Sequence, residues 1–350
     1  MDKLRWTTAR GQMLVLAGIA LAGFPFYAQR GPGTTPAPTV AGHGAADRVD
    51  SRTCTTCHQQ IYADYAKTGM GRSFYRPGAG SPAENIAAAN DFYHALSDTH
   101  FSMQVRNGDY FQRRWQVGPT GQEINAEEAK IDYVMGSGNH ARSYLHQTAR
   151  GTLIELPLGW YAEDRAPSPM SPSARHWGLS PGSDSGHPLT RRFVSYKCMF
   201  CHNGIPQIPP ANEEPDSDPV FTGALPQGID CQRCHGPGGR HIRTVQTRGS
   251  TRADVVASIL NPARLSPKAR MEVCMQCHLE TSSGRIPAAI VRFNRAPFSF
   301  VPGEPLAAFM LTFDQAPGTG YDDKYEAVNS VYRLRKSQCF LQSAGKMTCE

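Results

Sequence analysis

The stretch Gly228-Ile-Asp-Cys231-Gln-Arg-Cys234-His235-Gly-Pro-Gly238 contains a pattern that recurs along the chain. Two cysteines stand three positions apart, and a histidine follows the second cysteine directly. The chain has ten cysteines and 12 histidines in 350 residues, so four such histidines by chance have a probability on the order of one in a million. The repeating unit is therefore C-x-x-C-H, and it occurs at Cys54–His58, Cys198–His202, Cys231–His235 and Cys274–His278.

The spacing of this unit fits the covalent attachment of a haem. Two thiols three positions apart can form thioethers to the two vinyl groups of one haem, while the adjacent histidine ligates its iron. We therefore expect four c-type haems. The attaching cysteines are Cys54, Cys57, Cys198, Cys201, Cys231, Cys234, Cys274 and Cys277, and the iron-ligating histidines are His58, His202, His235 and His278.

A zinc ribbon is the main alternative, because it needs two C-x-x-C pairs that converge on one metal. The pairs beginning at Cys198, Cys231 and Cys274 have suitable spacing, but zinc binding of this kind does not explain the four histidines. A thioredoxin-like site would have one C-x-x-C after a strand, and a disulfide scaffold does not need the histidines.

The ligand on the other side of each iron decides between an electron carrier and a catalyst. His43 lies in a linker, and a lone histidine is more often a hydrogen-bonded residue than a ligand. His241 follows His235 by six residues through a glycine-rich turn, so as a ligand it would serve a neighbouring haem. Seven histidines remain for the four irons: His94, His100, His140, His146, His176, His187 and His241.

The N-terminal segment has the layout of a secretory signal. Lys3, Arg5 and Arg10 precede an apolar run from Met13 to Ala28, and no clear small-residue cleavage site follows. Residues 1–28 are therefore predicted to be a signal peptide or an N-terminal anchor, although the run is short for a membrane span. Both alternatives place the chain in the periplasm or on the outer face of the cytoplasmic membrane. Residues 29–52, rich in Gly, Pro, Ala and Thr, are predicted to be a flexible linker.

Composition favours short elements, because 33 glycines and 27 prolines make up about a sixth of the chain, against about 12% on average. We expect a mainly α fold with much irregular structure and a small β section, packed around haems. Residues 53–195 would hold the first haem motif and the β section, and residues 196–350 the haem cluster.

Local patterns predict individual elements within this organisation. Asn107-Gly108-Asp109 predicts a hairpin turn between strands at Phe101–Arg106 and Tyr110–Val117, and Thr152–Leu156 predicts another strand. Ser81-Pro82 predicts the start of a helix that runs toward His94. Three further helices are predicted at Ala253–Leu260, Lys268–Cys277 and Asp323–Phe340.

Four segments together resemble bacterial multihaem cytochromes with doubled C-x-x-C-H motifs: Ile131–His146, Cys198–Asn203, Gly228–Gly238 and Cys274–Thr281. These proteins are similar to the tetrahaem cytochromes of ammonia oxidisers, and many carry tetratricopeptide repeats after the haem region. The resemblance covers roughly Cys54 to Glu350. It implies bis-histidine haems, with His140, His187 and His241 as the best-matched distal ligands and His94 and His146 as further candidates.

The chain departs from that family at its C-terminal end. The family's counterpart of Ser337–Cys349 continues into another C-x-x-C-H unit, whereas this sequence stops at Glu350. The resemblance makes Cys349 the first cysteine of an incomplete fifth motif, so a fifth haem is expected if the chain continues. The alternative is a disulfide between Cys339 and Cys349, which the compartment permits.

The positive charge does not by itself indicate a nucleic-acid partner. The formal charge is +6 and the isoelectric point about 8.8, but four haems bring about eight propionate charges that offset it. Candidate partners of the propionates are Arg191, Arg192, Arg333, Arg335 and Lys336, for which a solvated helix face is the default interpretation.

The expected function is extracytoplasmic electron transfer to redox partner proteins, with no nucleic acid and with membrane association through the N-terminal segment if it is an anchor. The alternative is a haem-based oxidoreductase that acts on a small nitrogen or sulfur compound at one open haem. No motif has lysine in place of its histidine, as the active haem of pentahaem nitrite reductases does, and no catalytic residue is assigned.

Overall fold

The computed structural model describes residues 47–78, 92–162, 177–180, 192–213, 217–279, 289–313, 316, 318–320, 330–344 and 346–349. The chain divides into two compact units, Met1–Ala41 and Gly42–Glu350, and every described residue lies in the second. The predictions for residues 1–28 and for the helix beginning at Ser81 fall outside the described residues, as do most of the predicted linker, His176 and His187.

The expectation of a mainly α fold with a small β section is wrong. About 30% of the described residues are helical and about 25% lie in strands, which form sheets of seven, four and two strands. Most strands of the seven-stranded sheet have only two to four residues, too few to show an alternating pattern in the sequence. The partners of β1 and β11 are distant in sequence, so their pairing depends on tertiary packing.

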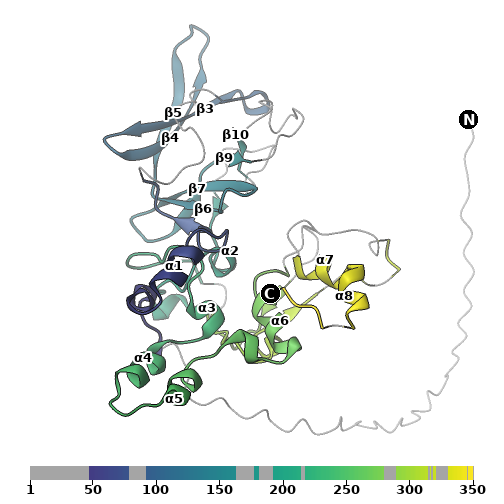
Figure 1. Ribbon diagram of the computed structural model, residues 1–350. Coiled ribbons are helices and arrows are strands. Elements are labelled where there is room, and N and C mark those ends of the chain that lie inside the picture. The colour runs from purple at the N-terminus through teal and green to yellow at the C-terminus, as the bar shows by residue number, and fades with distance from the viewer. Residues whose placement is uncertain are drawn as a thin grey trace, which may run out of the picture. The chain divides into compact units, whose positions relative to one another are not determined.

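The four-stranded sheet is antiparallel, in the order β2-β3-β4-β5. Its strands are β2 (Phe92–His94), β3 (Thr99–Arg106), β4 (Asp109–Val117) and β5 (Glu123–Ile131). Asn107 and Gly108 have φ values of 54° and 83°, as a two-residue hairpin turn requires, so the predicted hairpin is confirmed. Strands β4 and β5 run side by side as a long second hairpin (Figure 1).

The seven-stranded sheet has the order β1-β6-β7-β8-β11, with β9 paired to β7 and β10 paired to β9. The predicted strand at Thr152–Leu156 is confirmed as β8. Phe101 and Met103 of the four-stranded sheet share a hydrophobic core with Tyr144 and Leu158 of this sheet. The strands are β1 (Phe74–Tyr75), β6 (Tyr133–Met135), β7 (Ala141–Gln147), β8 (Leu153–Glu155), β9 (Leu158–Tyr161), β10 (Trp177–Leu179) and β11 (Arg192–Phe193).

The described helices are short. They are α1 (Gln59–Tyr65), α2 (Tyr196–His202), α3 (Gln232–His235), α4 (Gly239–Gln246), α5 (Arg252–Ala257), α6 (Pro267–Met275), α7 (Ser330–Lys336) and α8 (Gln338–Gln342). The predicted helices at Ala253–Leu260 and Lys268–Cys277 are confirmed as α5 and α6. Of the one predicted at Asp323–Phe340, residues 323–329 lie outside the described residues, and the remainder is divided into α7 and α8 because Ser337 caps α8. None of the described helices is both long and apolar enough to cross a bilayer.

Short 3-10 helices and one small sheet complete the described structure. The two-stranded sheet pairs β12 (Ala289–Val291) with β13 (Met310–Thr312). The 3-10 helices are η2 (Ser51–Thr56), η4 (Ala95–Ser97), η5 (Pro210–Asn212), η6 (Pro262–Arg264) and η7 (Leu306–Ala308).

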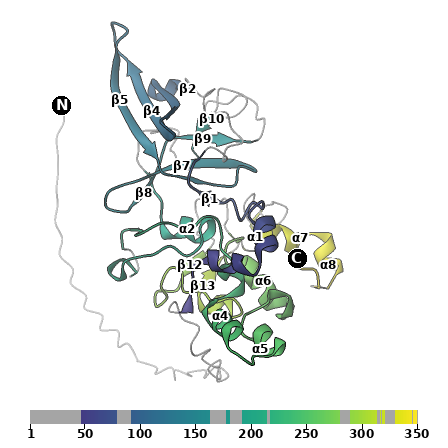
Figure 2. The same ribbon diagram turned by 60° about the vertical axis from the view of Figure 1, so that its left-hand side comes forward.

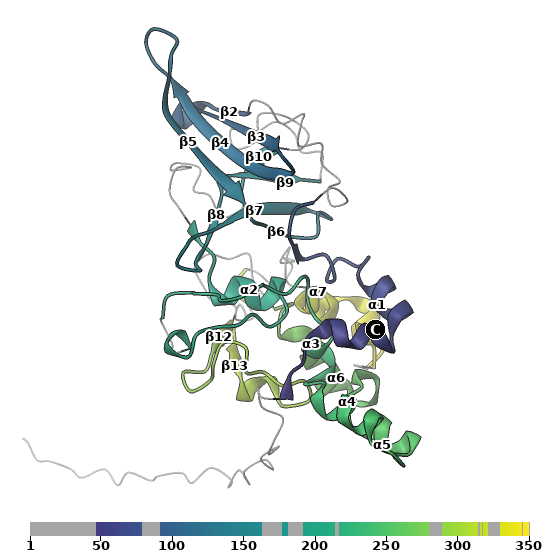
Figure 3. The same ribbon diagram turned by 90° about the vertical axis from the view of Figure 1, so that its left-hand side faces the viewer.

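A second hydrophobic core joins the seven-stranded sheet to the helices that carry cysteine motifs. Tyr133 and Leu145 from the sheet belong to the same cluster as Phe200 of α2, Met271 of α6 and Phe309. Helix α2 lies next to the sheet in all three views (Figures 1, 2 and 3). Each large apolar side chain buried here contributes about 1.5–3 kcal/mol, so this core fixes α2 and α6 in place without regular helix bundling.

Candidate functional site

Each C-x-x-C-H unit folds as one helical turn. We number the units motif 1 (Cys54–His58), motif 2 (Cys198–His202), motif 3 (Cys231–His235) and motif 4 (Cys274–His278). In motifs 1, 3 and 4 the histidine amide donates a hydrogen bond to the carbonyl of the first cysteine, over 2.9, 2.9 and 3.0 Å, and motif 2 lies within α2. Residues three apart on such a turn are neighbours. None of the eight motif cysteines forms a disulfide.

Motifs 1 and 3 are in direct contact. The Cys231 thiol donates a hydrogen bond to the sulfur of Cys54, which lowers the pKa of Cys54 to about 7. The side-chain amide of Gln232 accepts from the Val49 amide at 3.0 Å and donates to the Val49 carbonyl at 2.8 Å. Tyr65 also donates to the Ile229 carbonyl at 2.9 Å. The end of the predicted linker therefore packs against motif 3.

Motifs 2 and 4 form a second pair. The Cys201 thiol donates a hydrogen bond to the sulfur of Cys277, which lowers the pKa of Cys277 to about 7, and the nearby Arg233 guanidinium acts in the same direction. The Cys277 thiol in turn lies 3.7 Å from the Phe200 carbonyl oxygen. Contacts between single thiols thus bring the attachment points of two motifs together in each pair.

Residues between the cysteines connect the two pairs. The guanidinium of Arg233, in motif 3, donates to the Phe200 carbonyl at 2.9 Å and lies 3.9 Å from the centre of the Phe200 ring in motif 2. Gln276, in motif 4, donates to the Arg233 carbonyl at 3.0 Å. Arg233 is only 3% exposed. No role was predicted from the sequence for the two residues between the cysteines of each motif. The only sequence feature that could have indicated one is the charged or amide side chain at Arg233 and Gln276.

His241, on α4, lies near the histidine of motif 1. The ring centres of His58 and His241 are 6.5 Å apart, with 16° between the ring planes. Two metal–nitrogen bonds of about 2 Å, plus about 1 Å from each nitrogen to its ring centre, place two imidazoles about 6 Å apart across one metal ion. The observed separation fits that arrangement.

His235 and His241 are each held by hydrogen bonds at Nδ1, an arrangement in which Nε2 is the nitrogen that could bind a metal. The Nδ1 atom of His241 lies 3.2 Å from the Val255 carbonyl oxygen and 2.9 Å from Ser258 Oγ. The Nδ1 atom of His235 lies 2.9 Å from the Leu260 carbonyl oxygen. Metal-ligating histidines characteristically use their second ring nitrogen in this way.

His202 and His278 have the electrostatic environment that a ligand needs. Burial lowers the pKa of both histidines, and His278 lowers the pKa of His202 further, while the Glu155 carboxylate opposes that lowering. Metal binding requires the neutral imidazole, which a lowered pKa favours. The donor set of the four motifs therefore fits haem iron.

The other predicted distal histidines lie in or beside the sheets. His94, at the end of β2, is fully buried, with Nδ1 2.9 Å from Ser97 Oγ and with Nε2 lacking a hydrogen-bond partner. His146, on β7, has Nδ1 3.0 Å from both the Lys130 carbonyl oxygen and Asp132 Oδ2. His140 is exposed just before β7, and His187 lies outside the described residues. Among the predicted distal histidines that the structure describes, His241 is the one whose ring lies near the ring of a motif histidine, His58.

The two C-terminal cysteines are exposed and free. The Cys349 thiol lies 3.7 Å from the Met271 sulfur on α6, the helix that leads into motif 4. No disulfide between Cys339 and Cys349 is present in this structure, and Cys349 lies beside the helix that leads into motif 4.

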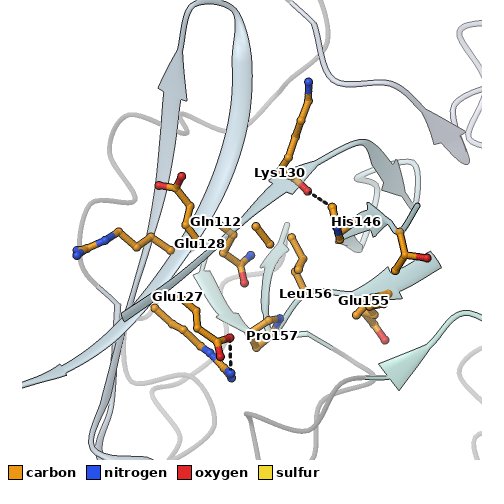
Figure 4. A pocket seen from close by; sticks show the side chains of 13 residues that line it. Gln112, Glu127, Glu128, Lys130, His146, Glu155, Leu156 and Pro157 are labelled. Carbon is orange, nitrogen blue, oxygen red and sulfur yellow. Dashed lines mark hydrogen bonds and ion pairs between the residues drawn. The ribbon is translucent and has the colours of Figure 1, made fainter. Parts of the chain in front are cut away.

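A separate pocket of about 280 Å³ is lined by residues of β4, β5, β7 and β8. Figure 4 shows the hydrogen bond from His146 to the Lys130 carbonyl within it. Its wall contains an ion pair between Arg114 and Glu127 at 2.7 Å. Opposite charges balance within this pocket, and none of the four motifs lines it.

Within the described ranges, no three histidine, cysteine, aspartate or glutamate side chains gather as a site that could hold a metal ion. No protein-family model, curated protein or solved structure matches the chain.

Proposed function

We propose that the chain is a multihaem c-type cytochrome that transfers electrons outside the cytoplasm, with one haem attached at each of motifs 1 to 4. The observation that carries the proposal is the clustering of four C-x-x-C-H turns, joined through Arg233 and Gln276. When bound, a haem iron supplies reversible one-electron chemistry.

The residues of the chain would have three separate tasks. The eight motif cysteines hold the haems through thioethers, and His58, His202, His235 and His278 ligate the irons. His241 would be a further iron ligand at motif 1, because its ring centre lies 6.5 Å from that of His58. Cys54 lies beside Cys231 and Cys201 beside Cys277, so the attachment points of each pair would be adjacent, which favours electron transfer between haems.

The partners and location follow from the same proposal. Covalent haem attachment takes place outside the cytoplasm, in agreement with the signal-like N-terminal segment, and the partners would be soluble or membrane-bound redox proteins. A fifth haem would be attached at Cys349 if the natural chain extends past Glu350.

A haem count tests the proposal directly. Protein produced in a periplasm that attaches c-type haems should contain about four haems per chain in a pyridine haemochrome assay. The double variant Cys54→Ala/Cys57→Ala should lower the count by one, and so should the matching pair in motif 4. Cys339→Ala, outside the motifs, is the control and should leave the count unchanged. A colourless protein that binds zinc would overturn the proposal.

Electron paramagnetic resonance of the oxidised protein tests the carrier role. Low-spin signals alone would support an electron carrier. A high-spin signal together with turnover of nitrite or hydroxylamine would contradict it and indicate an enzyme.

A further inference from the structure

Glu155, at the end of β8, is a buried carboxylate with three hydrogen-bond donors. It is 6% exposed. Its Oε1 atom accepts hydrogen bonds from the hydroxyls of Ser143, at 2.7 Å, and Ser180, while Oε2 accepts from Arg192 at 3.1 Å. Donors of this kind stabilise a negative charge that burial would otherwise make costly. Arg192, a candidate propionate partner by sequence, is thus engaged with this carboxylate.

The sheet that contains Glu155 also holds both ends of α2. The Val194 amide donates to the Leu153 carbonyl at 2.9 Å, and Ser195 then caps the first turn of α2. At the other end of the helix, the Ser73 hydroxyl donates to the His202 carbonyl at 2.6 Å, directly before β1. His202 is therefore fixed relative to the strands.

Glu155 lies on the face of the sheet that packs against α2. Side chains alternate along a strand, so Glu155 shares a face with Leu153 and lies beside Leu145 in the register of β7 and β8. Leu145 and Leu153 both belong to the core that contains Met199 and Phe200 of α2. The electrostatic effect of Glu155 on the pKa of His202 agrees with this placement.

We propose that Glu155 is a positioning residue that lowers the reduction potential of the haem at motif 2, by keeping a buried negative charge beside its ligand His202. The inference rests on the proposed function. A nearby negative charge stabilises ferric iron relative to ferrous iron, which carries one electron more, and the effect is strong where water is excluded. The half-exposed Arg192 offsets part of this charge.

Two substitutions with opposite expected effects test the inference in the haem-loaded protein. In a spectroelectrochemical titration, Glu155→Gln should raise one of the four midpoint potentials, and Arg192→Gln should lower the same one. The expected change in the ferrous-to-ferric ratio at fixed potential is about threefold to tenfold, or about 30 to 60 mV at about 59 mV per tenfold. Glu155→Asp keeps the negative charge, so its midpoint potentials should be closer to those of the unmodified protein.

Glu127→Gln is the matched control, because it removes a carboxylate paired with Arg114 in the other sheet and should shift no potential. Four haems with unchanged potentials in both test variants would overturn the inference and leave the proposed function intact. A shift in the same direction in both variants would indicate altered packing and also overturn it. If the unmodified protein contains no haem, the proposed function itself would be overturned. If Glu155→Gln fails to fold, the midpoint potentials of Arg192→Gln alone test the inference.

Discussion

The imidazole of His241 lies opposite that of His58, with ring centres 6.5 Å apart, although 182 residues separate the two positions in the sequence. Motif 3 ends at His235, and the turn at Gly236, with φ 73°, leads directly into α4. The Asp47 carboxylate accepts from the Arg240 amide at 2.9 Å and so holds this turn beside the segment that precedes motif 1. One stretch of chain thus carries the cysteines of motif 3 and the histidine proposed as a ligand at motif 1.

Replacing His241 with alanine should change the spin state of one haem without changing the number of haems. Attachment depends on thiols that the substitution leaves in place, whereas the iron at motif 1 would lose its proposed second histidine ligand. Electron paramagnetic resonance should show one new high-spin centre, with about four haems per chain by haemochrome assay. His100→Phe, in the four-stranded sheet, should leave all signals low-spin. Unchanged spectra for His241→Ala would rule out this ligation.

Replacing Ser195 with alanine should lower the thermal unfolding midpoint by removing the N-cap of α2. The Ser195 hydroxyl accepts from the Cys198 amide at 3.3 Å, and loss of such a cap costs about 0.5–2 kcal/mol. Ser266→Ala removes the equivalent cap of α6 and should cost a similar amount. Calorimetry on samples of equal haem content measures both. An unchanged midpoint for Ser195→Ala would show that the sheet alone holds the start of α2.

Replacing Gly228 with alanine should destabilise the protein more than replacing Gly249. Both glycines have positive φ, 62° and 90°, so each substitution introduces backbone strain of about 1 kcal/mol. A Cβ at Gly228 would also lie 2.2 Å from the Gly71 carbonyl oxygen, whereas a Cβ at Gly249 meets no atom within 4 Å. In chemical denaturation, Gly228→Ala should therefore lose more free energy of unfolding than Gly249→Ala, because only Gly228→Ala adds a steric clash to the backbone strain. Equal losses would mean that the Gly71 segment moves aside.

Replacing Arg233 with methionine should destabilise the motif cluster. The Phe200 carbonyl would lose a buried hydrogen bond, at a cost of about 1–3 kcal/mol, and the Phe200 ring would lose its cation contact. Arg248→Met changes an exposed arginine of the same half and should alter stability by about 0.5 kcal/mol or less. Thermal unfolding and haem count together measure the effect. If both variants unfold alike, Arg233 does not connect the motifs.

The features predicted correctly from sequence are those with local causes. A C-x-x-C-H unit and an Asn-Gly turn depend on neighbouring residues alone, so the positions of the motifs and the hairpin at Asn107 could be located in advance. The pairing of motif 1 with motif 3 depends on Gln232 and Val49, which are far apart in the sequence. Nothing near either residue signals the contact.

The fold class was mispredicted for a related reason. Strands such as β1 and β11 have two residues each, and they exist because β6 and β8 lie alongside them. Arg233 and Glu155 are charged residue types that are usually exposed, yet both are buried here and form hydrogen bonds. The burial of a charged residue becomes apparent only when the tertiary structure shows which groups form hydrogen bonds with it.

The amide clamp between Gln232 and Val49 spans 183 positions of the chain. During synthesis and export, the N-terminal part of a chain emerges first. If the chain is exported and loaded with haem as proposed, motif 1 would reach the oxidising compartment before the segment that holds it in place. Its two thiols would then meet the attachment machinery on an unfolded chain, and the order in which haems are loaded need not follow the order in which their sites become buried.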